Sequence, residues 1–123
     1  MSEEIEKVFY NKLIRDKIPE IMSSKDKAFE IRELDDVEYE KELIKKVEEE
    51  ASGLQSANTR EELVSELADT IDVIDEIKKL KNISEEEIRS GQLKNAEKKG
   101  GFEKKIFLVW SQKDDYQSNE IRR

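Results

Sequence analysis

The chain contains neither cysteine nor histidine among its 123 residues. Without cysteine it can form no disulfide bond, and without thiolate or imidazole ligands a zinc site is not expected. Any metal ion would therefore be held by oxygen ligands, which favours Mg²⁺, with Mn²⁺ as an alternative.

Long apolar runs are missing as well, because only 35% of the residues are hydrophobic. No run approaches the ~20 residues of a membrane-spanning helix, and the first residues lack the basic and then apolar pattern of a signal peptide. We therefore expect a cytoplasmic protein without a membrane partner. No repeat or Pro/Gly-rich linker divides the sequence, so we expect one domain over residues 1–123, with a frayed tail at 111–123.

Charge, by contrast, is abundant. Charged residues make up 44% of the chain, against about 25% in an average soluble domain. The formal net charge of −8 argues against a nucleic-acid partner, because binding a phosphate backbone needs a cationic face. A small phosphorylated ligand stays compatible with this charge, since a bound metal ion inverts the local field.

Capping signals and apolar spacing predict helices over most of the chain. Pro19 suits the first turn of a short helix at 19–23. Asp35 or Asp36 caps a long helix that runs to about residue 55, and the Thr59–Glu62 capping box begins a second, at 59–81. A further capping box at 84–87 begins a third helix, which the glycines at 100 and 101 end.

Two short segments are rich in strand-forming residues. Residues 29–32 alternate apolar and charged side chains, and residues 106–110 form a continuous apolar run. We therefore predict an all-α helical bundle with a minor two-stranded β element. So few apolar residues leave little to bury within one chain, and the helices would find a second partner in a homodimer or homotetramer.

Two acidic clusters stand on the long helices, at Glu48–Glu50 and at Glu66 and Asp69. Positions three or four apart share a helical face. Glu50 follows Val47 by three residues and therefore lies at the edge of the apolar stripe, whereas Glu49 falls on the far side.

Glu66 and Asp69 continue an apolar stripe of the following helix, formed by Val73, Ile77 and Leu80. A second stripe occupies the adjoining face of that helix and consists of Leu63, Leu67, Ile71 and Ile74. Periodicity alone leaves two interpretations open for Glu50, Glu66 and Asp69. They converge on a divalent cation, or they belong to a very acidic solvated surface.

Three sequence blocks, taken in order, resemble the MazG-like superfamily of all-α nucleoside triphosphate pyrophosphohydrolases. The similarity is greatest to its phosphoribosyl-ATP pyrophosphohydrolase-like branch. The blocks are residues 10–19 (YNKLIRDKIP), residues 46–51 (KVEEEA) with 66–69 (ELAD), and residues 98–108 (KKGGFEKKIFL).

The resemblance implies Mg²⁺-dependent cleavage of a nucleoside triphosphate between the α- and β-phosphates, giving a monophosphate and pyrophosphate. The acids of the superfamily's motif fall on Glu49, Glu50, Glu66 and Asp69. Glu50, Glu66 and Asp69 would hold the metal, with Glu49 as a further ligand or a base that orients water. The substrate-binding residues that the resemblance suggests are Asn11, Lys12, Arg15, Lys17 and Lys99.

One position departs from the motif, because its last glutamate falls on Gly53. Gly53 could mark a lost ligand, end the helix in a left-handed conformation, or make room for substrate. Two alternative functions therefore stay open. One is a phosphoribosyl-ATP pyrophosphohydrolase of histidine biosynthesis, and the other is a catalytically weakened relative that binds a nucleotide or a protein partner. If Gly53 marks a lost ligand, Gly53→Glu should lower the Mg²⁺ concentration needed for half-maximal activity and raise turnover.

Overall fold

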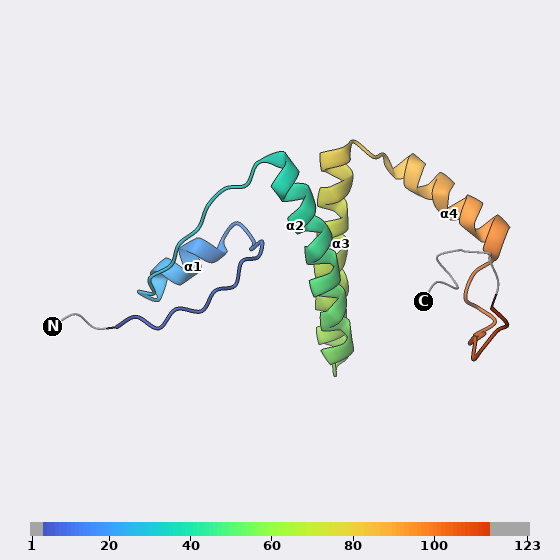
Figure 1. The fold of residues 1–123 in the computed structure, drawn as a ribbon, viewed down its shortest axis with the longest axis horizontal. Coiled ribbons are helices and arrows are strands. Elements are labelled where there is room, and N and C mark those ends of the chain that lie inside the picture. The colour runs from blue at the N-terminus through green and yellow to red at the C-terminus, as the bar shows by residue number, and fades with distance from the viewer. Residues whose placement is uncertain (1–3, 114–123) are drawn as a thin grey trace. The chain divides into compact units, whose positions relative to one another are not determined.

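The computed structural model describes residues 4–113, which contain four α-helices, one short 3-10 helix and no strand (Figure 1). The α-helices are α1 (Ile18–Ser24), α2 (Asp36–Gly53), α3 (Arg60–Lys81) and α4 (Glu85–Lys99), and the 3-10 helix η1 (Leu54–Ser56) joins α2 to α3. The predicted all-α fold is confirmed. The chain divides into two compact units after Ser84, and each is considered by itself.

Side-chain caps determine where the two long helices begin. Asp35 Oδ1 accepts a hydrogen bond from the Glu38 backbone N–H at 2.9 Å, immediately before α2. Thr59 Oγ1 accepts one from the Glu62 N–H at 3.1 Å at the start of α3, and Glu62 Oε2 accepts one from the Asn58 N–H at 2.8 Å. The bonds to Asp35 and Thr59 satisfy N–H groups that a helix leaves unpaired in its first turn.

Helices α2 and α3 lie side by side as an antiparallel hairpin (Figure 1). Leu43 of α2 is only 3% exposed, and Val47 is half-buried. On α3 the half-buried apolar residues are those of the predicted stripe, Val73, Ile77 and Leu80. The sequence predicted two apolar stripes on α3 without deciding between them, and the structure shows that this one packs against α2.

The second stripe of α3 remains uncovered. Leu63, Val64, Leu67, Ile71 and Ile74 have relative exposures between 40% and 55%. Leu43 is the one buried residue among residues 4–113. The hairpin therefore presents a long apolar surface that the described part of the first unit does not bury.

The predicted two-stranded β element is not found in the described chain. Residues 29–32 and 106–110 have no regular secondary structure, and side chains such as Phe107, 86% exposed, are open to solvent. Apolar alternation predicts how side chains would be distributed on a sheet, but a strand also needs a paired neighbour. An isolated two-stranded ribbon is marginal in water, so the apolar pattern alone was not enough to predict strands here.

The second unit contributes α4, whose end is well explained by the sequence. Gly100 follows the helix with φ of 78°, the left-handed conformation that glycine adopts without strain. Of the predicted frayed tail, residues 111–113 have no regular structure, and the remainder lies outside the described residues. The single domain over 1–123 stays a prediction.

None of the helices within residues 4–113 has both the length and the apolar character needed to cross a membrane. The cytoplasmic location stays a prediction.

Candidate metal centre

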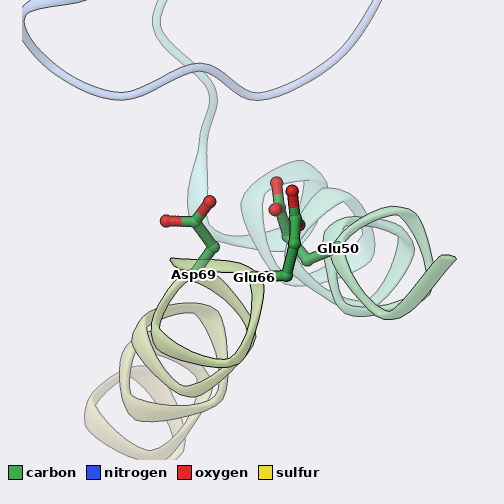
Figure 2. A group of neighbouring side chains, drawn as sticks. All are labelled: Glu50, Glu66 and Asp69. Atoms are coloured by element: carbon green, nitrogen blue, oxygen red, sulfur yellow. The ribbon is translucent and has the colours of Figure 1, made fainter. Parts of the chain in front are cut away.

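Three carboxylates meet at the end of the α2–α3 interface nearest η1. Glu50 comes from the last turn of α2, and Glu66 and Asp69 come from the first half of α3. Each is half-buried, and one oxygen from each lies within 4.8 Å of the other two. Figure 2 shows the carboxylates of Glu50 and Glu66 side by side, with Asp69 beside them on α3.

Helical spacing explains this meeting. On α2, Glu50 continues the covered stripe of Leu43 and Val47 by one turn. On α3, Asp69 and Glu66 continue the covered stripe that begins at Val73. Because η1 joins the two helices by a short turn, both acidic continuations lie at the same end of the hairpin.

The donor set suits a hard divalent cation. Mg²⁺ binds oxygens at about 2.0–2.1 Å, so two ligands on opposite sides of the ion lie about 4.2 Å apart. Neighbouring ligands lie about 3 Å apart, so the three oxygens, all within 4.8 Å, would move closer together around a shared ion. Three carboxylates also leave coordination positions for water and for phosphate oxygens.

Glu49 does not join this group of three. Its side chain is 39% exposed, and its Oε1 accepts a hydrogen bond from Lys12 Nζ at 2.9 Å. Lys46 Nζ lies 3.4 Å from the other oxygen of Glu49. The hydrogen bond from Lys12 is the main cause that lowers the pKa of Glu49 below its usual value. In this arrangement Glu49 is an ionised partner of lysine beside the cluster.

Two cations of the N-terminal segment reach the acidic residues. Besides Lys12, Arg15 Nη2 lies 2.8 Å from Asp69 Oδ1 and 2.7 Å from Asp72 Oδ2. The hydrogen bonds to Asp72 and Asp69 raise the pKa of Arg15. This segment passes on the side of the hairpin toward which the three carboxylates point (Figure 2).

The cluster is unevenly compensated. Lys46 Nζ lies 3.4 Å from Glu50 Oε1, and Arg15 pairs with Asp69. Within residues 4–113, Glu66 is the one acid of the three without a cation beside its carboxylate. The carboxylate of Glu66 also lies next to that of Glu50, and two neighbouring negative charges repel each other.

Within residues 4–113, neither Asn11 nor Lys17 forms an ion pair or a hydrogen bond with the acids. Asn11 is exposed and has a left-handed φ of 46°, which asparagine tolerates better than most residues. Lys17 is exposed at the N-cap of α1. Lys99 is the last residue of α4, in the second unit, so its part in the site stays a prediction.

Lys46 and Asp72 were not among the predicted site residues. Lys46 precedes Glu49 by three residues and Glu50 by four, the spacing at which a lysine reaches both along one helix. Asp72 follows Asp69 by three residues, so one guanidinium can bind both. Both signals were present in the spacing of the charges.

Gly53 lies against Glu66. Its backbone is right-handed, with φ −60° and ψ −27°, so the explanation by a left-handed helix end is wrong. A Cβ atom built at residue 53 would overlap Oε2 of Glu66 and lie 2.8 Å from its Cδ. The carboxylate of Glu66 thus occupies the space that a side chain at 53 would need.

Comparisons of the chain with protein-family models, with curated proteins and with solved structures found no significant match.

Proposed function

We propose that the protein is a Mg²⁺-dependent nucleotide pyrophosphohydrolase. A water molecule would attack a nucleoside triphosphate, breaking the bond between the α- and β-phosphates and releasing a monophosphate and pyrophosphate. The observation that carries this proposal is the convergence of Glu50, Glu66 and Asp69 within 4.8 Å. The resemblance of three sequence blocks to MazG-like pyrophosphohydrolases supports it independently.

The three carboxylates would hold the ion. Carboxylates brought this close repel one another, and a divalent cation between them removes that penalty. When bound, Mg²⁺ neutralises charge on the polyphosphate and makes a water molecule more acidic. Because all the donors are oxygens, Mn²⁺ should substitute for it.

Lys12 and Arg15 would bind the phosphates. In the structure without substrate they neutralise Glu49, Asp69 and Asp72. Once a cation and a triphosphate are present, the same side chains can transfer their hydrogen bonds to phosphate oxygens, which guanidinium groups bind well. Departure of Lys12 would also free the carboxylate of Glu49, a candidate base for orienting the attacking water.

The alternative of a weakened relative loses its main support. That alternative treated Gly53 as a lost metal ligand. The space at Gly53 is filled by the carboxylate of Glu66, which is itself a candidate ligand. The glycine therefore does not by itself imply a depleted site.

A nucleotide panel assayed for pyrophosphate release tests the proposal. The panel should contain standard and non-standard triphosphates together with phosphoribosyl-ATP, each with Mg²⁺ and with a chelator. Pyrophosphate release that requires Mg²⁺ would support the enzyme, and a preference for phosphoribosyl-ATP would select the histidine-biosynthesis alternative. Saturable binding without turnover would instead support the weakened relative.

We also propose that the chain assembles through the uncovered stripe of α3. Leu63, Leu67, Ile71 and Ile74 lie on one face and are all exposed. A helix that is apolar on two sides needs cover on both, and α2 covers one. A second copy of the same hairpin would cover the other, giving the predicted homodimer or homotetramer.

A further inference from the structure

We infer that Gly53 is a positioning residue of the candidate metal centre: the missing side chain lets the carboxylate of Glu66 lie against α2, beside Glu50. The inference rests on the proposed function, since it takes Glu66 as a metal ligand. It assigns to Gly53 a role opposite to that of a lost ligand.

The backbone gives no reason for a glycine at this position. The φ of −60° and ψ of −27° at Gly53 are ordinary helical values, which every residue except proline adopts readily. Glycine in a helix is about 1 kcal/mol less favourable than alanine. Alanine at residue 53 would therefore favour the helix more than glycine does. We look to the surrounding side chains for the reason that glycine stands there.

Those surroundings contain the carboxylate of Glu66. A Cβ at residue 53 would overlap Oε2 and lie 2.8 Å from Cδ, well inside the ~3.5 Å at which non-bonded carbon atoms pack. The overlapping atoms are the end of a flexible side chain and not backbone. A new Cβ would thus displace the carboxylate by rotation, while the helices stay in place.

Displacement of this carboxylate would change the cluster itself. The oxygens of Glu50, Glu66 and Asp69 lie within 4.8 Å of one another, and a shift of about 1 Å in one of them is large against the ~0.1 Å tolerance of Mg²⁺–oxygen distances. A glutamate at residue 53 would begin with the same Cβ, so it would displace Glu66 before supplying a ligand. Gly53→Glu should therefore weaken metal binding.

The chain offers a matched control. Gly91 lies within α4, and a Cβ built there would meet nothing within 4 Å. Gly53→Ala and Gly91→Ala both replace a helical glycine, so both should keep or raise the melting temperature without metal. Only Gly53→Ala should lower the affinity for Mn²⁺, measured by the electron paramagnetic resonance signal of free Mn²⁺. We expect a loss of about tenfold or more, as for other residues that orient metal ligands.

A second pair of variants tests whether Gly53 acts through Glu66. Glu66→Asp shortens the side chain by one methylene and alone should weaken Mn²⁺ binding. If Gly53 acts by making room for Glu66, adding Gly53→Ala to Glu66→Asp should weaken Mn²⁺ binding much less than adding it to the natural chain. Independent effects would instead multiply.

Several outcomes would overturn the inference. Natural and Gly53→Ala proteins with equal Mn²⁺ affinity would exclude the positioning role and leave the proposed function standing. A natural chain that binds no Mn²⁺ would overturn the proposed function and the inference together. Loss of helical circular dichroism in Gly53→Ala, with Gly91→Ala intact, would show that the helices give way instead of the carboxylate, which also contradicts it.

Discussion

At the scale of single residues, Asp69 takes part in two sets of contacts. Its carboxylate belongs to the acid cluster and also pairs with Arg15 at 2.8 Å. The pair is well exposed on the arginine side, and Arg15 keeps a second partner in Asp72. Such pairs add little to stability, so the importance of Asp69 should lie in binding and not in folding.

We therefore expect Asp69→Asn to lower turnover by about a hundredfold or more, because a neutral amide is a poor ligand for Mg²⁺. The free energy of unfolding should change by less than about 1 kcal/mol. Pyrophosphate release and urea denaturation measure the two quantities. Asp75→Asn, which alters an acid of the same helix outside the cluster, serves as the control. Turnover equal to that of the natural protein in Asp69→Asn would sink the proposed site.

The ion pair between Lys12 and Glu49 predicts a pH dependence. Because the hydrogen bond from Lys12 lowers the pKa of Glu49 in the folded chain, this group adds stability above the pKa of an unfolded glutamate. That contribution disappears as the pH falls through the lowered pKa of the folded state. Lys12→Met should raise the pKa of Glu49 and make acid denaturation less steep.

An NMR titration of the Glu49 carboxyl group, combined with urea denaturation between about pH 3 and pH 6, would measure both effects of Lys12→Met. The effect on stability should be small, since both side chains are about two-fifths exposed. Lys45→Met is the control, because Lys45 pairs with Glu42 and not with Glu49. An unchanged pKa of Glu49 in Lys12→Met would contradict the contact.

At the scale of helices, the start of α3 depends on Thr59. Its hydroxyl oxygen accepts the hydrogen bond from the Glu62 N–H at 3.1 Å. Thr59→Ala should lower the free energy of unfolding by about 1 kcal/mol, the usual effect of losing an N-cap. Thr70→Ala is a matched control, because the Thr70 hydroxyl bonds the Glu66 carbonyl inside the helix and caps nothing. Equal destabilisation by both substitutions would argue against a capping role.

The helices were predictable because their signals are local. Asp35, Thr59 and Gly100 mark helix ends through groups a few residues away, and the structure has them where the sequence predicted. The same local periodicity placed Glu50 at the edge of an apolar stripe, and Glu66 and Asp69 on one of the two apolar faces of α3. It could not decide whether the acids of two different helices meet.

Features that depend on distant neighbours were not predictable. The role of Gly53 depends on how closely α2 approaches Glu66 of α3, a distance that no spacing within one helix specifies. The strands predicted at 29–32 and 106–110 were not found for a related reason, because strand pairing needs a second segment in register. Arg15 lies far from Asp69 in sequence, and its contact could be suspected only from the resemblance of its segment.

At the scale of the whole molecule, the uncovered stripe of α3 predicts assembly. Light scattering at micromolar concentration should give a mass of at least twice 14.5 kDa. Leu67→Glu would place a charge in the proposed interface and should lower that mass, since a buried unpaired charge is strongly unfavourable. Leu93→Glu on α4 makes the same change at another exposed leucine and should leave it unaltered. A single-chain mass for the natural protein would refute the assembly.

The nearly coreless hairpin has a consequence for how binding events affect one another. With Leu43 as the one buried residue in the described range, little apolar packing among these residues favours the folded state. A cation at the acid cluster and a second copy on α3 would each bind only folded chains. Each would therefore shift the folding equilibrium toward the folded state. Dilution should then weaken the apparent affinity for Mg²⁺, and Mg²⁺ should tighten self-association by the same factor. The two sites would be coupled through folding alone, without any change of shape in the folded chain.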